Sequence, residues 1–265
     1  MNEQLSLHRL GLLLRGDAIG NYRTLAVYSS ALASVMLITS MISNATGNFG
    51  PGSNFYLIWF VVMLFVWGTI ACSYSFQELH DKTRNEAYLS LPASALEKTL
   101  ARLLRITLGF VIYLLIFTLL TSWVVNGVNW LAFNRSGPSF QPFDPMVWQF
   151  MDDFIVNQSI YFLGAAWFRK SHFAKTALSS MIAGIGLSLI AALMIRITFG
   201  PFLDFAAVGA EAGFGRAVEL FFADHAAQLS TLTKVLQVLY YVCLPLFCWS
   251  VAWMRVQETQ VSHGV

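Results

Sequence analysis

Long apolar runs separated by short polar segments dominate this sequence, and their length predicts its fold. Six windows each carry about 20 predominantly apolar residues, the length that a helix needs to cross a hydrocarbon layer of about 30 Å. The predicted spans lie at about residues 24–43, 55–76, 106–125, 145–168, 176–198 and 234–254. The pattern therefore predicts an all-α integral membrane protein in which residues 1–265 form one transmembrane domain.

Segments outside these windows add detail to the prediction. Residues 4–16 have the pattern of an amphipathic helix lying on the inner membrane face. Asp144 is a suitable N-cap and Pro145 suits the first helical position, so the fourth span is expected to begin there. Residues 200–233 are too polar to cross the membrane and too apolar for a solvated linker. We expect two short outer or re-entrant helices within them.

The most charged internal stretch reads HDKTRNEAYLSLPASALEKTLAR and lies between the second and third predicted spans. Ser94 and Glu97 have the spacing of a capping box, in which two side chains satisfy two backbone N–H groups at a helix start. A helix is therefore predicted to begin at Ser94, with an apolar stripe of Leu96, Leu100, Leu103 and Leu104. Pro92 disfavours helical geometry at the residue before it, so a separate short helix is expected within residues 81–92.

This short helix is predicted to end in an apolar tip formed by Tyr88 and Leu89. Charged side chains of both signs flank the tip, namely Lys82, Arg84 and Glu86. Mixed charge around an aromatic residue favours docking of a protein partner. The other interpretation is a cytoplasmic loop that binds anionic membrane lipid through its basic residues, and the residues alone leave both open.

Composition and charge strengthen the membrane prediction and orient it. Hydrophobic residues make up 57% of the chain and charged residues 11%, against roughly 25% charged in soluble domains. If both termini are cytoplasmic, twelve of the 16 Lys and Arg residues fall on the inner side. The outer side then keeps Arg135, Arg196, Arg216 and Lys234. This asymmetry follows the positive-inside rule, so both termini are predicted to be cytoplasmic.

Polar residues inside the fourth predicted span form a candidate pathway. Gln149, Asp153 and Asn157 are spaced four residues apart and share one helix face, with Asp152 beside them. A carboxylate within a membrane is costly unless it is paired or faces water. Arg196, in the fifth span, is a candidate ion-pair partner. The alternative is that this part of the helix projects into water, and the residues leave that open.

The sequence contains no evident motif for catalysis, phosphate binding or metal binding. It contains no G-x-x-x-x-G-K-[ST] phosphate loop and no nucleophile elbow, and its five histidines lie in separate segments. The three cysteines lack metal-ligand spacing and are interpreted as small apolar residues in helices. We therefore predict no catalytic residue, no metal site and no cofactor in this chain, and no nucleic-acid partner.

The order of spans, the LSLPAS..EK pattern at Leu89–Lys98 and the closing WMRVQETQV resemble permease subunits of type-2 ABC exporters. The resemblance covers nearly the whole chain. It implies that residues 81–92 form a coupling helix that contacts an ATP-binding cassette subunit, which would hold ATP and Mg. It also implies that residues 4–16 lie along membrane lipid, that two permeases pair as a homo- or heterodimer, and that the chain resides in a bacterial inner membrane.

Two other functions stay open at this point. A secondary transporter would use Asp152 or Asp153 to couple transport to an ion gradient. A membrane-embedded enzyme would use Glu78, His80 and Asp81 at the inner interface. The three hypotheses differ in their energy source and in whether the chain acts without a partner.

Overall fold

A computed structural model describes residues 7–46, 54–76, 94–134, 137–168, 172–208 and 226–262. Every regular element in these ranges is helical, and none is a strand. The all-α prediction is therefore confirmed for them. The α-helices are α1 (Leu7–Ala45), α2 (Phe55–Ser73), α5 (Ala95–Leu104), α6 (Phe110–Phe133), α7 (Pro145–Trp167), α8 (His172–Val208), α10 (Ala226–Val238) and α11 (Leu244–Ser262). Two π-helical segments, η1 (Arg105–Gly109) and η2 (Leu239–Cys243), continue directly into their neighbours.

Five helical stretches in this part of the chain are long and apolar enough to cross a membrane, judged by length and composition. They correspond to the first, second, third, fifth and sixth predicted spans, so the chain is a multi-pass membrane protein. The helix predicted at 145–168 forms as α7 but is not among the five, because polar residues lower its hydropathy. The count of six spans stays a prediction. The five stretches are Leu25–Ala45, Phe55–Ser73, Ala95–Phe133, Phe173–Met194 and Thr233–Thr259.

Both predicted helix starts are confirmed. The Asp144 carboxylate accepts a hydrogen bond from the backbone N–H of Met146 at 2.9 Å, and Pro145 occupies the first turn of α7. At the start of α5, Ser94 Oγ accepts from the Glu97 backbone N–H at 3.2 Å. The Glu97 carboxylate accepts from the Ser94 N–H at 3.0 Å in return. These bonds satisfy donors that a helix start otherwise leaves without partners.

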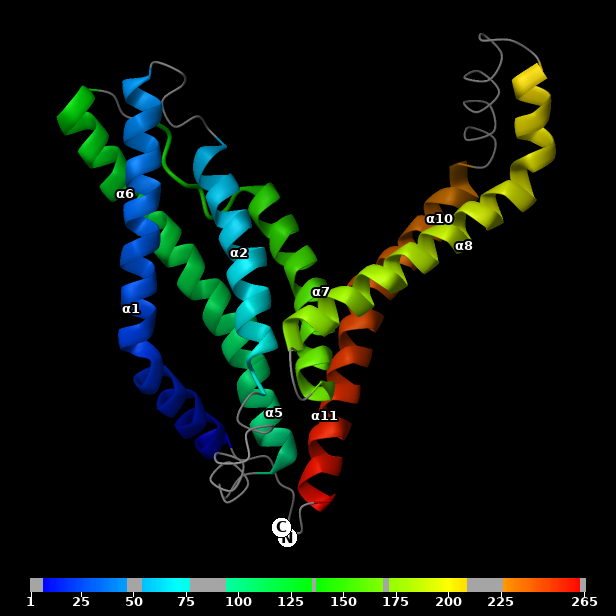
Figure 1. The fold of residues 1–265 in the computed structure, drawn as a ribbon, viewed down its shortest axis with the longest axis horizontal. Helices are drawn as coiled ribbons and strands as arrows, with labels where there is room; N and C mark the ends of the chain where they lie inside the picture. The colour runs from blue at the N-terminus through cyan, green and yellow to red at the C-terminus, as the bar shows by residue number, and fades with distance from the viewer. Residues whose placement is uncertain are drawn as a thin grey trace.

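The helices α1, α2, α6 and α7 form a bundle, and α7 packs against α2, α8 and α11 (Figure 1). Large apolar side chains from each bundle helix meet in its core, where they are almost fully buried. They include Met36 of α1, Phe60 of α2, Leu114 of α6 and Phe154 of α7. Burial of this kind contributes roughly 1.5–3 kcal/mol per large side chain relative to exposure in water, although lipid reduces that gain.

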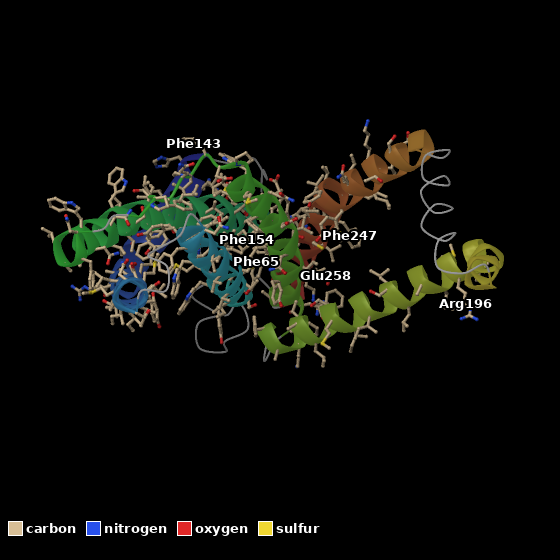
Figure 2. The ribbon with its side chains drawn as sticks, turned by 90° about the horizontal axis from the view of Figure 1, so that it is seen from above. Phe65, Phe143, Phe154, Arg196, Phe247 and Glu258 are labelled. Atoms are coloured by element: carbon tan, nitrogen blue, oxygen red, sulfur yellow. The ribbon has the colours of Figure 1, made fainter. Side chains whose placement is uncertain are left out.

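Two arms leave this bundle. We call α10 (Ala226–Val238) the α10 arm, and we call α8 beyond its first turns the α8 arm. They overlap in Figure 1, but the view turned by 90° in Figure 2 shows that they diverge. The described parts of residues 200–233 belong to the ends of these two long helices, where two separate short helices were expected. The remainder, 209–225, lies outside the described residues.

A close helix crossing anchors the root of the α8 arm. A Cβ atom built on Gly164 of α7 would lie 2.6 Å from Thr176 Cγ2 and 2.8 Å from Thr176 Cβ. Glycine therefore permits an approach that any larger residue would obstruct. One turn earlier on α7, the ring of Tyr161 stacks on Phe173, with ring centroids 5.7 Å apart. Beyond this root, the side chains described in α8 are mostly exposed.

The N-terminal helix is continuous where the sequence predicted two units. Residues 4–16 were expected to form a helix separate from the first span, but α1 runs unbroken from Leu7 to Ala45. Figure 1 shows a change of direction within it, so its first part lies at an angle to the part beside α6. The apolar stretch long enough to span begins at Leu25. Residues 4–6 lie outside the described part.

The buried face of α5 is polar, whereas the sequence drew attention to its leucines. Glu97 and Lys98 are 1% and 3% exposed, while Leu96 is 40% exposed. The helix α5 contacts α1 and α11, and its Leu103 packs against the core cluster that includes Val256 of α11. The Arg102 guanidinium lies 5.3 Å from the centre of the Phe76 ring, a cation–π contact. Charged side chains of α5 thus turn toward protein, whereas Leu96 turns outward.

Candidate functional site

The packing of Phe154 fixes the depth of α7. Phe154 is fully buried, and its ring centroid lies 6.1 Å from those of Phe65 and Phe110 (Figure 2). Phe65 lies about 15 Å along α2 from Phe55 and about 12 Å from Ser73, at 1.5 Å per residue. Phe154 is therefore level with the middle of α2, one of the helices long and apolar enough to cross a membrane.

The predicted polar face of α7 therefore lies at this depth. Asp153 is adjacent to Phe154 in the helix and is half-buried, as is Asn157 one turn further on. Gln149 and Asp152 are exposed. The structure brings these four residues together on one part of α7. If α7 crosses a membrane beside α2, a position level with the centre of α2 places these residues at membrane depth, where a carboxylate is costly unless it is paired or faces water.

The partner of Asp153 is a tyrosine that sequence reasoning missed. Tyr241 donates its hydroxyl hydrogen bond to Asp153 Oδ1 at 2.7 Å. Tyr241 belongs to η2, and the ring of Tyr240 meets it edge-on with centroids 5.0 Å apart. In the sequence, Tyr241 lies inside an ordinary apolar run, 88 residues from Asp153. No local signal connects the two, so only the packing of η2 against α7 reveals the pair.

The negative charge at this site has no positive counterpart within the described ranges. Neither Asp152 nor Asp153 forms an ion pair with a residue whose placement is known. Arg196, the candidate partner, lies well along the α8 arm, far from Phe154 in Figure 2. The structure therefore does not bring Arg196 together with the two aspartates. A carboxylate at membrane depth with one neutral donor is costly unless water or another group reaches it.

A second polar contact joins α7 to the other π-helical segment. Gln158 is fully buried, and its amide exchanges hydrogen bonds of 2.9 and 3.1 Å with the hydroxyl of Thr107 in η1. Both π-helical segments thus present a hydroxyl group to α7. Single-turn π-helical insertions occur often at functional sites. Gln158 is saturated by a neighbour and buried, so it serves to fix α7 rather than to bind a ligand.

Other buried polar groups hold the opposite end of the bundle. The Tyr56 hydroxyl donates to Asn126 Oδ1 at 2.8 Å, and the Asn126 amide donates to the Gly137 carbonyl at 3.1 Å. Asn129 donates to Ser40 Oγ at 2.7 Å, which ties α6 to α1. Interhelical bonds of this kind contribute on average about 0.6 kcal/mol each in a membrane protein. They are far from Asp153 along the helices and stabilise the scaffold.

The predicted coupling residues Lys82, Arg84, Glu86, Tyr88 and Leu89 lie outside the described residues. So do Glu78, His80 and Asp81 of the enzyme hypothesis. The described flanks of this segment meet, because Arg102 of α5 lies over the ring of Phe76, which follows α2. In Figure 1, the start of α1 and the end of α11 lie at this same end of the molecule.

Comparisons with known proteins identified no relative of this chain. No family model, no curated protein and no solved structure matches the chain. Among the described residues, no group of three or more His, Cys, Asp or Glu side chains could hold a metal ion. The fold and composition define a helical multi-pass membrane protein, and the candidate site is the polar face of α7 with Tyr241.

Proposed function

We propose that this chain is the membrane-spanning permease subunit of a transporter, with the polar face of α7 lining the transport route. The observation that carries the proposal is the position of Asp153. Its carboxylate lies on α7 level with the middle of the apolar helix α2 and meets a single neutral donor. Asp152 beside it is exposed on the surface of the chain. Ionisable groups at such depth are found where they face a water-filled route or take part in transport.

The proposal includes that α7 also crosses the membrane, which gives six spans in total. Its 23 residues extend about 34 Å, enough to cross a hydrocarbon core. Exposed aromatic side chains lie near both ends, with Phe143 and Trp148 at one and Trp167 at the other. Such side chains concentrate at the two membrane interfaces. Even spans with both termini cytoplasmic, in a bacterial inner membrane, complete the proposed topology.

The proposed energy source is a separate ATP-binding cassette subunit that docks on residues 81–92. This part rests on the sequence pattern of the segment and its resemblance to type-2 ABC exporters. The structure of the two described flanks supports it. Its described flanks are joined by the Arg102–Phe76 contact, and the capping box of Ser94 and Glu97 fixes the following helix. A force applied to residues 81–92 would reach α5, and through α5 both α1 and α11. A second permease subunit would complete the assembly.

A secondary transporter is the second candidate, because an uncompensated carboxylate at mid-depth also suits coupling to an ion gradient. Asp152 and Asp153 would then bind the coupling ion. The two candidates share the route and differ in energy source. ATP hydrolysis by a co-purified partner, stimulated by this chain, supports the first candidate. Uptake that follows an imposed ion gradient and ignores ATP supports the second.

The route itself can be tested without knowing the cargo. In a chain whose cysteines at 72, 243 and 248 are replaced by alanine, we would compare Asp153→Cys with Val62→Cys in lipid vesicles. Val62 lies about 4.5 Å along α2 from Phe65 and is 48% exposed on an apolar helix, so it is a control at similar depth. A charged, membrane-impermeant thiol reagent should modify Asp153→Cys at least about tenfold faster, because only ionised thiolates in contact with water react. Equal, slow reaction at both positions would contradict the proposed route.

A further inference from the structure

The α7–α11 contact is a parallel seam with a nearly constant register. Asp153 pairs with Tyr241, Ser159 neighbours Cys248, and the Arg255 guanidinium lies 5.1 Å from the centre of the Trp167 ring. The first pair is 88 residues apart, and the last has the same separation. From Asp153 to Trp167 the seam covers about 21 Å. The two helices are thus held together along most of α7.

This seam ends at Tyr241. Along the seam, Val256 and Ala252 are fully buried and Cys248 is 4% exposed. Tyr241 is already 38% exposed, and Val238 one turn beyond it is 56% exposed. The α10 arm therefore separates from α7 immediately after the Tyr241–Asp153 bond. That bond joins the C-terminal helix to α7 at the point where the two separate.

The π-helical segment η2 lies at the same branch point. It spans Leu239–Cys243 and so contains Tyr241. Sharp changes in helix direction commonly occur at π-helical insertions, where the regular hydrogen-bond pattern is interrupted. In Figure 1, α11 and α10 run in different directions on the two sides of this segment. Tyr241 is the central residue of η2, so its bond to Asp153 joins the segment where the helix changes direction to α7.

We infer that the Tyr241–Asp153 hydrogen bond is a latch that holds the base of the α10 arm at the polar face of α7. When the bond is intact, the Tyr241 ring covers Asp153 and shields it from the space between the arm and the bundle. When it breaks, the arm swings about η2 and leaves Asp153 and Asn157 accessible. The inference deepens the proposed function, and rests on it only for the claim that this face carries cargo. The swing itself is independent of that claim.

The arm position can be measured directly. In the full-length cysteine-replaced chain in lipid nanodiscs, spin labels at Leu236→Cys on α10 and Val62→Cys on α2 report the arm-to-bundle distance, because both side chains are exposed. Tyr241→Phe removes the hydroxyl group and keeps the ring. Tyr240→Phe is the matched control, because it makes the same change one residue away, on a ring that contacts Tyr241. Both variants retain the apolar character of η2.

Tyr241→Phe should raise the ratio of long to short distances by about threefold to eighteenfold, the range expected for one interhelical hydrogen bond in a membrane. Tyr240→Phe should leave the ratio at its wild-type value. A wild-type distance distribution in Tyr241→Phe, or equal shifts in both variants, overturns the latch. A latch that opens in Tyr241→Phe while Asp153→Cys stays unreactive toward the charged thiol reagent would instead refute the route and leave the latch standing.

Discussion

Replacing Gly164 by alanine tests the crossing that roots the α8 arm. The new methyl group would lie 2.6 Å from Thr176 Cγ2 and 2.8 Å from its Cβ, closer than carbon atoms approach in folded proteins. Thr176 is 2% exposed and has a short, β-branched side chain, so it has little freedom to move away. One of the two helices must therefore shift. Overpacking of this kind typically costs about 1–3 kcal/mol.

Gly184→Ala provides the matched control on the α8 arm. It adds the same methyl group within a helix, but no heavy atom lies within 4 Å of the added carbon. Both substitutions gain up to about 1 kcal/mol of helix propensity. The difference between the two variants therefore isolates the steric cost at Gly164. We expect Gly164→Ala to be less stable than Gly184→Ala by about 1–3 kcal/mol.

The assay is unfolding of the purified chain in mixed micelles with increasing SDS, followed by far-UV circular dichroism.

A second variant tests whether the cost at Gly164 comes from contact with Thr176. Thr176→Ala removes the side-chain oxygen and the Cγ2 atom, two of the three atoms closest to the new methyl group. Gly164→Ala should therefore cost less in that background, giving a coupling energy between two residues in contact. Equal stability of Gly164→Ala and Gly184→Ala would refute the close crossing of α7 and α8.

The remaining predictions concern topology and the partner. Cysteines placed at Ser53 and Ser136 should react with an impermeant reagent from outside intact cells, and one at Thr83 only after the membrane is opened; labelling of Thr83 in intact cells would reverse the orientation. Tyr88→Ala should weaken co-purification of the ATP-binding subunit more than Lys82→Ala does, because interfaces concentrate their energy in buried aromatic anchors while exposed charges contribute about 0–1 kcal/mol. The opposite ranking would favour anchoring to lipid.

Features set by neighbouring residues could be predicted from the sequence. Apolar length located five helices that are suited to spanning, because hydropathy adds up along the chain without reference to any other segment. The starts of α5 and α7 were predicted correctly, because a cap needs only residues within one helical turn. The shared face of Gln149, Asp153 and Asn157 also followed from helical spacing.

Contacts between distant segments required the tertiary structure. The pairing of Asp153 with Tyr241 depends on the register of α7 against the C-terminal helix, and nothing near either residue encodes that register. The depth of Asp153 follows from the packing of Phe154 on Phe65. The buried charges of α5 show the same limit, because an amphipathic pattern identifies two faces without showing which one meets protein. In a membrane both lipid and protein accept apolar side chains, so packing alone decides which face turns inward.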